Sequence, residues 1–464
     1  MKLFGTDGIR GLAREFPLVE DFVVKAGYVA VKEVLKEPGA FCPSSDASNR
    51  IPLVLIGRDS RDSGRDITDW LVRGIAAAGC RVWDVGVVPT PAVSYLAPKL
   101  EAVCAIVVSA SHNPPEFNGI KFFSANGTKL PPRLEERIEA ILHGELEAPS
   151  VSKAEIKKLY ACRPELAEEY VEFLASTMPA DINLCGMSLV LDCANGAAYK
   201  IAGELFERLG AKVAVIGDKP DGKNINVNCG SLHLDNLCRE TRRLKADCGF
   251  ALDGDADRVL FSDEKGAPLD GDDIIAIAAS EMRKSGLLKW DKAVLTVMSN
   301  CGLVQWFKKE NIETVQVPVG DKYVSEALEM HDLSIGGEAS GHIIFRDFAP
   351  TGDGLLTAVQ VLSIMRKSGR KLSWFRNLWT RYPTELRAVK VKEKTPLSKL
   401  AGFDGAVKKL EKSLGPGSRV FIRYSGTEPK LRILVEGPDA AKVRYVSDEI
   451  EKMYREKMKG ALCG

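Results

Sequence analysis

The sequence predicts an α/β protein, with three α/β domains built on mixed sheets and a smaller α+β domain at the C-terminal end. Three successive blocks each alternate short apolar, β-branched runs with helical segments, a pattern that favours parallel or mixed sheets. The last segment, from about Tyr382, combines its strands and helices differently. The length of 464 residues suits three or four domains of ordinary size.

The first block begins with a predicted helix over residues 21–36, whose apolar side chains follow helical spacing and which ends before Pro38. A second helix is expected around Trp70. The segment 40–49 is rich in Ser, Asp and Pro, which predicts a surface loop without an assignable role. Strands of this block are predicted at 53–56, 81–85 and 103–108.

The later blocks repeat this alternation. Strands are predicted at 189–191, 212–216, 248–252, 294–297, 314–317 and 333–335. The last segment has predicted strands at 420–422 and 431–435 and helices at 396–414 and 439–458. We therefore expect domains at 1–162, 163–265, 266–381 and 382–464. In each α/β block a strand runs into a polar loop of small residues, which would suit a cleft shared between domains. These loops are 109–114, 253–258 and 336–342.

Composition excludes several classes of protein. The apolar share of 45% and the charged share of 27% are those of a globular protein, and the net charge of +1 does not favour nucleic acid as a partner. The longest apolar runs have the length of strands, and the first residues lack a signal-peptide pattern, so no membrane partner is expected. The eleven cysteines lack zinc-ribbon and CxxC spacings, which favours reduced thiols in a cytoplasmic protein.

The loop at 109–114 carries the first candidate for chemistry. The preceding run, 103–108, predicts a buried strand, and the prolines after Asn113 exclude a helix. Ser111 therefore lies on a tight loop at the carboxyl end of a strand, where ligands bind in open α/β sheets. His112 stands beside it. An ordinary Ser/Asn/Pro turn is the alternative.

The second candidate is an acidic loop with three alternating carboxylates: Asp253, Asp255 and Asp257. Such a group repels itself unless a hard cation lies among the oxygens, and Mg²⁺ prefers such ligands together with a phosphate oxygen. Arg258 suits that phosphate. A calcium loop would use Glu264 at its twelfth position, but its sixth position is Arg258 instead of glycine, and 259–261 predicts a strand. A metal-free acidic turn is the other alternative.

Three further motifs could bind a phosphorylated, polyhydroxylated ligand. Glu338, Ser340 and His342 alternate with small residues, so their side chains could converge on a sugar, although a Gly-rich turn is the alternative. The run 423–429, followed by Arg432, supplies two arginines, two hydroxyls and backbone N–H groups for a phosphate, or else forms a surface turn. The run 4–11 combines three glycines with Arg10, a pattern that also occurs in a simple turn.

Taken together and in this order, these motifs resemble the α-D-phosphohexomutase family over residues 4 to about 436. The runs 4–11, 319–324 and 425–429 are most similar to the branch that acts on glucosamine phosphate, more than to the glucose and mannose enzymes. The resemblance implies four domains around a central cleft. Ala256, Ala339 and Tyr424 depart from the family pattern.

The resemblance implies roles for individual residues. Ser111 would carry the phosphoryl group, and the catalytic residues would be Ser111, Lys121 and His342. The metal ligands would be Ser111, Asp253, Asp255 and Asp257. Substrate contacts would come from Arg10, His112, Arg258, Asp321, Glu338 and Ser340. The distal phosphate of the substrate would be held by Arg423, Ser425, Gly426, Thr427 and Arg432.

The resemblance also implies an activity: a phosphoserine enzyme with one Mg²⁺ interconverts glucosamine 6-phosphate and glucosamine 1-phosphate through a hexose 1,6-bisphosphate, for UDP-N-acetylglucosamine synthesis. The partner would be a small sugar phosphate, and the protein a monomer or homodimer. A glucose or mannose mutase of the same family is the first alternative. A metal-dependent phosphatase is another, which a water-excluding cleft would oppose. A non-catalytic binding protein would lack Ser111 or part of the acidic triad, and both are present.

Overall fold

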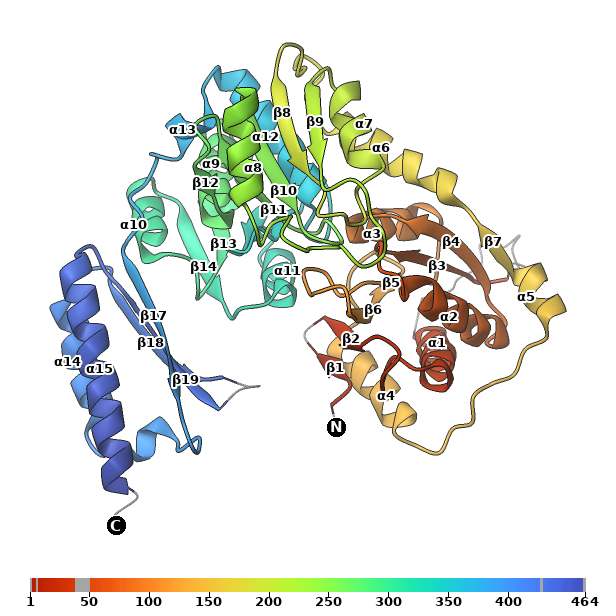
Figure 1. Ribbon diagram of the computed structural model, residues 1–464, viewed down its shortest axis with the longest axis horizontal. Coiled ribbons are helices and arrows are strands. Elements are labelled where there is room, and N and C mark those ends of the chain that lie inside the picture. Colours follow the sequence, from red (N-terminus) through yellow and green to blue (C-terminus); the bar gives the residue numbers. More distant parts are fainter. Residues whose placement is uncertain (1, 6, 38–50, 426–428, 462–464) are drawn as a thin grey trace. The chain divides into compact units, whose positions relative to one another are not determined.

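The computed structural model describes residues 2–5, 7–37, 51–425 and 429–461. The chain forms two compact units, one of residues 1–297 and 315–376 and the other of residues 298–314 and 377–464. The predicted loop at 38–50 lies outside the described residues. The first unit contains three sheets, which with their helices we call the first, second and third domains (Figure 1).

The first domain is built on a seven-stranded sheet. Its order is β1 (Phe4–Gly5), β2 (Gly8–Leu12), β6 (Phe117–Ser124), β5 (Cys104–Val108), β3 (Leu53–Arg58), β4 (Arg81–Val87) and β7 (Tyr160–Cys162). The strands from β5 to β7 run parallel, whereas β1, β2 and β6 pair antiparallel, which makes the sheet mixed as expected. Its helices are α1 (Glu20–Val34), α2 (Gly64–Ala77), α3 (Thr90–Lys99), α4 (Pro132–Leu142) and α5 (Lys153–Leu159).

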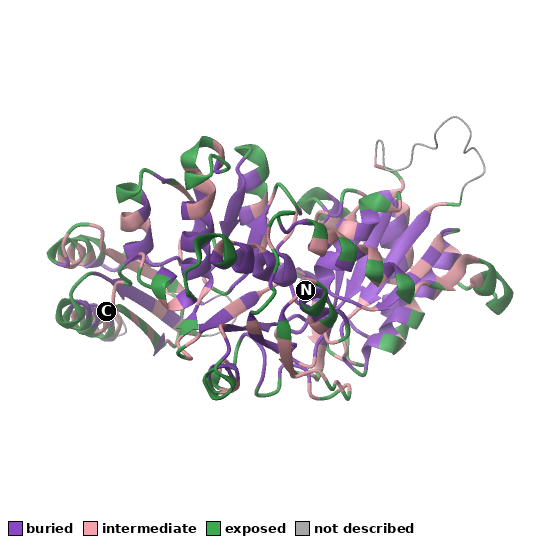
Figure 2. Cartoon of the chain, turned by 90° about the horizontal axis from the view of Figure 1, so that it is seen from above, coloured by how far each residue is buried: buried purple, intermediate pink, exposed green. Residues whose placement is uncertain are grey.

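The core of this domain explains why these elements form. Every residue of β5 is buried, as its uninterrupted apolar run predicts. In Figure 2 the buried colour is concentrated on strands, whereas the exposed colour is concentrated on helices and loops. The buried side chains of α1 follow helical spacing and pack with α2 on the sheet. The close approach of the two helices requires Gly74, where a Cβ would lie 2.1 Å from the Val24 carbonyl oxygen.

The second domain has a five-stranded sheet. Its order is β12 (Pro268–Leu269), β11 (Val259–Asp263), β10 (Cys248–Leu252), β8 (Ser188–Asp192) and β9 (Lys212–Ile216). The strands β8, β9 and β10 are parallel, and β11 returns antiparallel to β10. Its helices are η1 (Pro164–Leu166), α6 (Ala167–Ser176), α7 (Ile201–Arg208) and α8 (Asp235–Leu244). The tight β10–β11 connection places its loop at the carboxyl end of β10.

The third domain has a four-stranded sheet. Its order is β14 (Glu313–Val317), β13 (Lys292–Thr296), β15 (Ile335–Gly337) and β16 (Ile343–Phe345). Its helices are α9 (Gly271–Lys284), η2 (Lys289–Asp291), α11 (Asp321–Met330), α12 (Gly354–Ser368) and α13 (Leu372–Phe375). Gly336 and Gly337, predicted to begin a loop, belong to β15 instead, because both pair with the antiparallel strand β16.

The second unit is the smaller α+β domain. Its antiparallel sheet has the order β17 (Thr384–Lys390), β19 (Lys430–Glu436) and β18 (Arg419–Tyr424). Its helices are α10 (Cys301–Lys309), η3 (Leu397–Lys399), α14 (Phe403–Ser413) and α15 (Ala440–Ala461). The helix predicted at 396–414 is therefore broken into two, at Gly402, which has a left-handed backbone (φ 73°).

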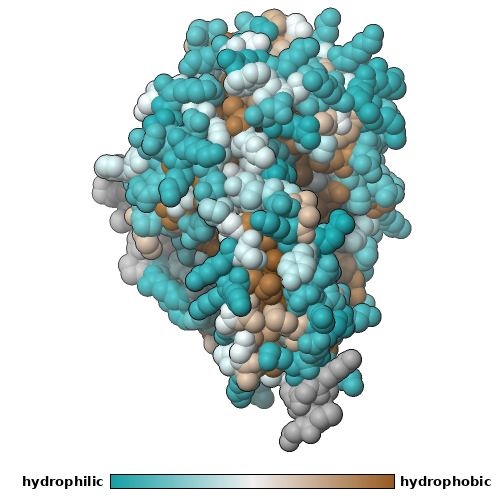
Figure 3. Space-filling view, turned by 90° about the vertical axis from the view of Figure 1, so that its left-hand side faces the viewer, coloured by the Kyte–Doolittle hydropathy of each residue, from teal (hydrophilic) through white to brown (hydrophobic). Residues whose placement is uncertain are grey.

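The surface agrees with the charge-rich composition. On the face drawn in Figure 3, hydrophilic side chains predominate and apolar ones are scattered among them. Within the described part of the chain, no helix combines the length and the apolar character that crossing a membrane requires.

Candidate active site

Ser111 lies three residues beyond β5, on a loop with a strained backbone. Its φ is 53°, a left-handed conformation that costs an L-residue roughly 1–2 kcal/mol. The side chain is buried, and its Oγ donates a hydrogen bond to Asp253 Oδ2 over 2.7 Å. The other hydroxyl of the loop, that of Ser109, donates to Asp59 and accepts the Ser111 N–H. The loop therefore aims Ser111, and not Ser109, at the acidic loop.

Two residues that the sequence did not single out hold this loop. Arg61 is fully buried, and its Nε lies 2.9 Å from Asp59 Oδ2. The same guanidinium donates hydrogen bonds to the backbone carbonyls of Ser111, Asn113, Pro114 and Phe117. Asn226, from the second domain, donates to two of these carbonyls as well. The polar run 57–61 at the end of a predicted strand was the available signal, since it has the pattern of the other site loops.

The acidic triad lies on the β10–β11 loop and is buried. Side-chain oxygens of Asp253, Asp255 and Asp257 all lie within 4.8 Å of one another. Burial, followed by the charges of Asp257 and Asp255, raises the pKa of Asp253 well above its usual value. Among the described residues, Asp255 Oδ1 and Asp257 Oδ1 have no hydrogen-bond partner. Buried carboxylate oxygens without partners suit a divalent cation, so the residues present fit the predicted metal ion.

The acidic loop and the serine loop approach each other closely. At Gly254, an added Cβ would lie only 2.5 Å from the Ser111 carbonyl oxygen, so only glycine fits there. Ala256, which departs from the family pattern, has φ 59° and is fully buried. The loop thus accepts a Cβ at this position in a left-handed conformation that glycine would adopt without strain.

The calcium-loop alternative is wrong. The residue at its twelfth position, Glu264, turns away and accepts hydrogen bonds from the backbone N–H and hydroxyl of Ser373. The segment after the triad is the strand β11, as predicted, and not the helix of a calcium-binding motif.

Lys121 is, within the described part of the chain, the cationic residue with the shortest contact to the triad. It lies on β6, is almost fully buried, and its Nζ is 2.7 Å from Asp255 Oδ2 and 3.4 Å from Asp257 Oδ2. Its third partner is Asp7, at 3.1 Å. Burial alone would lower the pKa of Lys121, but the three carboxylates outweigh it and raise that pKa well above its usual value. Asp7, which the sequence did not single out, thus belongs to the site; it also pairs with Arg10 on β2.

His342 lies between two carboxylates. Its Nδ1 is 3.8 Å from Asp257 Oδ1, and its Nε2 is 3.9 Å from Asp321 Oδ2. Burial acts to lower its pKa, but Asp257 and Asp321 raise it above the ordinary value. The imidazole packs against Gly352, where a Cβ would lie 2.3 Å from Nε2. The loop at 338–342 therefore brings His342 to the triad.

The loop at 338–342, which is predicted to contact the sugar, is called the sugar loop, and its other residues differ in exposure. Glu338 is buried and accepts a hydrogen bond from the Gly320 backbone N–H, which ties this loop to the start of α11. Ser340 lies on an exposed turn. Ala339 is half-buried between them. Asp321, predicted to contact substrate, begins α11 and forms an ion pair with Lys129.

Two further predicted substrate residues border the serine loop. His112 is half-buried, and its Nδ1 lies 3.3 Å from Ser111 Oγ. Burial, with the charges of Arg258 and Arg10, lowers the pKa of His112 to about 4. Arg258 lies 3.7 Å from Asp257 Oδ1, and its pKa is raised because its acidic neighbours outweigh the effect of burial. Arg258 and Arg10 both act on His112, the neighbour of Ser111, so positive charge lies near this loop and would suit the predicted phosphoryl group.

The second unit contains the predicted phosphate loop. Arg423 on β18 and Arg432 on β19 stand directly opposite each other in the sheet. Like charges in this arrangement repel, and an anion held between them would relieve the repulsion. Ser425 is buried, and its N–H donates to the Lys430 carbonyl. Gly426 and Thr427 lie outside the described residues.

Tyr424, the third departure from the family pattern, has a structural role. Its hydroxyl donates to the Thr395 carbonyl over 2.6 Å, and its ring packs against the core of the second unit. Because side chains alternate along a strand, Tyr424 points to the opposite face from Arg423. The substitution therefore leaves the arginine face of the sheet unchanged.

Comparisons with known proteins cover the whole chain. Four family models match in order, all described as phosphoglucomutase/phosphomannomutase: alpha/beta/alpha domain I at 1–148, domain II at 168–266, domain III at 270–382 and the C-terminal domain at 386–453. The chain is 43% identical to the phosphoglucosamine mutase of Clostridium novyi, covering 98% of this chain and 99% of that protein. It is 41% identical to the phosphoglucosamine mutase of Bdellovibrio bacteriovorus, over 97% of each.

The fold is also that of solved structures. A phosphoglucomutase/phosphomannomutase family protein from Burkholderia thailandensis superposes with a TM-score of 0.78, at 24% identity and over 98% of each chain. The matching family models, the full-length relatives and this shared architecture agree with one another. The chain therefore belongs to the phosphoglucomutase/phosphomannomutase family.

Proposed function

We propose that this chain is a phosphoglucosamine mutase, which interconverts glucosamine 6-phosphate and glucosamine 1-phosphate. The full-length relatives at 41–43% identity bear that name. The observation that carries the chemistry is the hydrogen bond of 2.7 Å from Ser111 Oγ to Asp253. It places a hydroxyl directly against a buried group of carboxylates that suits a cation, which is the arrangement needed for phosphoryl transfer through serine.

In the proposed reaction, phosphorylated Ser111 gives its phosphoryl group to the free hydroxyl of the sugar phosphate. The P–O bond to Ser111 Oγ breaks as a new P–O bond to the sugar forms, and the serine oxygen recovers a proton while the sugar hydroxyl loses one. The resulting hexose 1,6-bisphosphate then reorients end over end in the site and returns its other phosphoryl group to Ser111. Lys121 and His342 are the candidates for moving these protons, because both face the triad.

The triad would hold the metal ion, with an oxygen of the phosphorylated Ser111 as a further ligand. Buried carboxylate oxygens favour Mg²⁺, which when bound would neutralise charge on the transferring phosphoryl group. Arg258 and Arg10 supply positive charge from the protein itself. We assign Glu338, Ser340, His112 and Asp321 to the sugar, and the loop with Arg423, Ser425, Gly426, Thr427 and Arg432 to the phosphate that does not react.

The proposal includes the setting of the enzyme. All nine cysteines among the described residues are free, which suits a reducing compartment such as the cytoplasm. The product would then be available there for synthesis of UDP-N-acetylglucosamine. The oligomeric state would be a monomer or a homodimer.

A coupled assay on glucosamine, glucose and mannose 6-phosphates tests this proposal. We expect the highest kcat/KM on glucosamine 6-phosphate, phosphate on Ser111 by mass spectrometry, and no turnover by Ser111→Ala. Ser176→Ala is the matched control, because that hydroxyl lies on the exposed side of α6 and bonds only a carbonyl one turn back. A preference for glucose or mannose would assign the chain to another activity of the family. Release of free phosphate without isomerisation would identify a phosphatase.

A further inference from the structure

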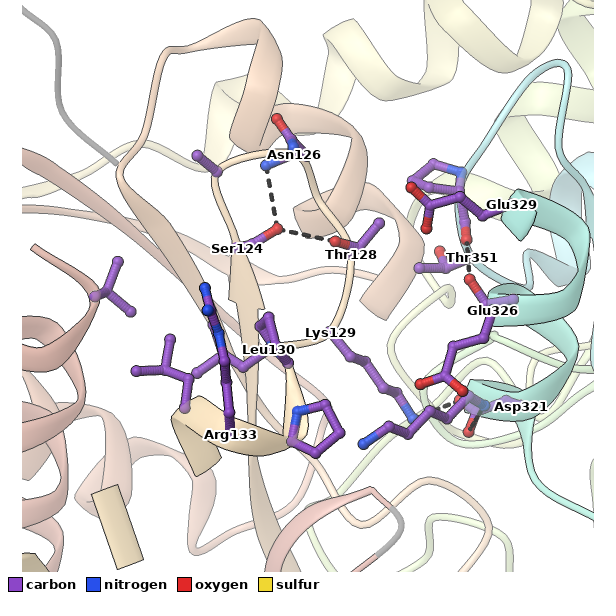
Figure 4. A pocket seen from close by; sticks show the side chains of 18 of the residues that line it. Ser124, Asn126, Thr128, Lys129, Leu130, Arg133, Asp321, Glu326, Glu329 and Thr351 are labelled. Carbon is purple, nitrogen blue, oxygen red and sulfur yellow. Dashed lines mark hydrogen bonds and ion pairs between the residues drawn. The ribbon is translucent and has the colours of Figure 1, made fainter. Parts of the chain in front are cut away.

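A cavity of about 560 Å³ lies between the first and third domains, both within the first unit. One wall is formed by the segment from the end of β6 to the start of α4, and the other by α11 and the loop at 350–351 (Figure 4). His342 and Asp321 line it as well. The facing surfaces are therefore not packed together here, so a charged side chain that crosses the cavity is a direct connection between the two domains.

Lys129 crosses this space. Figure 4 shows its side chain extending from the β6–α4 segment to Asp321 at the start of α11, with which it forms an ion pair. On its own side, Lys129 Nζ lies 2.6 Å from Asp7 Oδ1. The ammonium is thus shared by one carboxylate from each domain. All three side chains are at most one-fifth exposed, so solvent screens these pairs only weakly.

Both carboxylates belong to the catalytic surroundings. Asp7 also binds Lys121, which contacts the triad, and Asp321 lies 3.9 Å from His342 Nε2. A continuous chain of charged contacts therefore joins the acidic loop, the N-terminal turn and the third domain through Lys129. Among the residues that the structure describes, two other polar contacts join the same domains: Lys322 to Glu135 at 3.7 Å and Thr351 to Ser94 at 3.5 Å. Both are long.

We propose that Lys129 is a positioning residue for the reaction: it holds the third domain, with Asp321 and the sugar loop, at the spacing from the Ser111 loop that phosphoryl transfer requires. This inference rests on the proposed function. In-line transfer depends on sub-ångström placement, so loosening the bridge lowers the rate even though Lys129 touches neither sugar nor phosphate. Loss of the ammonium also leaves Asp7 and Asp321 as two carboxylates without their shared counter-charge.

Kinetics of four variants test the bridge. Lys129→Met should lower kcat on glucosamine 6-phosphate about 10- to 100-fold, with a smaller change in KM. Lys129→Arg should recover most of the loss, because a guanidinium can reach two carboxylates. Asp321→Asn should reduce kcat too and, because this residue is also assigned to the sugar, should raise KM. Lys129→Met already removes the ion pair to Asp321, so the kcat losses of the two changes should not add in the double variant. The matched control is Lys289→Met, which removes exposed ion pairs to Asp332 and Asp347.

Hydrogen–deuterium exchange supplies a readout that does not depend on activity. In Lys129→Met we expect backbone amides in the first turn of α11 and in 338–342 to exchange about tenfold faster than in the parent protein, with β5 unchanged. Lys129→Arg should leave exchange near the parent rate. Unchanged exchange together with unchanged kcat in Lys129→Met would refute the positioning role of Lys129 and would leave the proposed function unaffected. A parent protein that isomerises no hexose phosphate would overturn the proposed function, and faster exchange would still show the bridge between the domains.

Discussion

Arg61 and Asp59 form an ion pair whose side chains are both fully buried, with 2.9 Å between Nε and Oδ2. Each partner also holds the loop of Ser111. Arg61 donates to four backbone carbonyls of the loop, and Asp59 accepts from the Ser109 hydroxyl, which in turn accepts the Ser111 N–H. The strained backbone at Ser111 therefore persists because the hydrogen bonds of this ion pair fix the loop from both sides.

Replacing Arg61 tests this relationship. Arg61→Lys keeps the positive charge but loses the planar guanidinium, which donates hydrogen bonds to several backbone carbonyls at once. Some of the loop carbonyls and Asp59 would therefore lose hydrogen bonds. We expect a loss of about 3 kcal/mol in the free energy of unfolding and at least a tenfold fall in kcat. Chemical denaturation and steady-state kinetics measure the two effects. Arg65→Lys is the control, because that arginine is exposed one turn further along the chain; equal behaviour of the two variants would contradict the role of Arg61.

Removing a charge from the triad tests the metal site. Asp255→Asn eliminates one carboxylate and should weaken Mg²⁺ binding at least tenfold by calorimetry, because neutral amide oxygens are poorer ligands for a hard cation. EDTA should abolish turnover of the parent protein and Mg²⁺ should restore it. Asp332→Asn, at an exposed carboxylate of the third domain, should bind Mg²⁺ like the parent. Full activity after EDTA treatment would exclude a catalytic metal here.

The arginine pair and the sugar loop should affect different properties of the substrate. A charged hydrogen bond contributes roughly 1.5–3 kcal/mol, so Arg423→Ala should lose about 10- to 150-fold in kcat/KM on every hexose phosphate alike. Glu338→Ala should instead reduce the ratio of kcat/KM on glucosamine 6-phosphate to kcat/KM on glucose 6-phosphate. Arg387→Ala is the control, because its guanidinium lies in the same sheet but pairs with Asp448 and Glu451 of α15. Parent kcat/KM in Arg423→Ala would refute the phosphate assignment.

Asp353 should make stability depend on pH. Burial raises the pKa of this carboxyl to about 6, although it accepts hydrogen bonds from Tyr170 and from the first turn of α12. Because the native state holds the proton more tightly than the unfolded state, this group lowers stability as the pH rises from about 4 through about 6. The difference in the free energy of unfolding between Asp353→Asn and the parent should therefore shift in favour of the variant by about 2 kcal/mol as the pH rises from 4.5 to 7.5. Denaturant unfolding at both values measures this difference, and a constant difference would contradict the raised pKa.

The sequence by itself determined the features whose causes are local. The apolar runs that became β5 and β10 specify buried strands, and the polar loops after them specify where side chains leave the sheet. Ser111 and the acidic triad could be identified because the residues that define each motif are close together in the sequence. The strands β1, β2 and β6 were missed, because glycines and polar residues interrupt the alternation of apolar side chains that marks a strand. The pairing of β2 with β6, across about 110 residues, is a tertiary contact that the local sequence does not show.

Only the tertiary structure decided which distant side chains complete the site. Arg61 reaches a loop some 50 residues later, and Asn226 reaches the same loop from another domain. Lys129 joins Asp7 to Asp321, and Asp321 lies 192 residues beyond Lys129 in the sequence. The physical reason is that a buried charge is stable only with a counter-charge or hydrogen bonds, and folding supplies these from wherever the chain passes. The residues around a given position therefore do not predict which distant side chains will contact it.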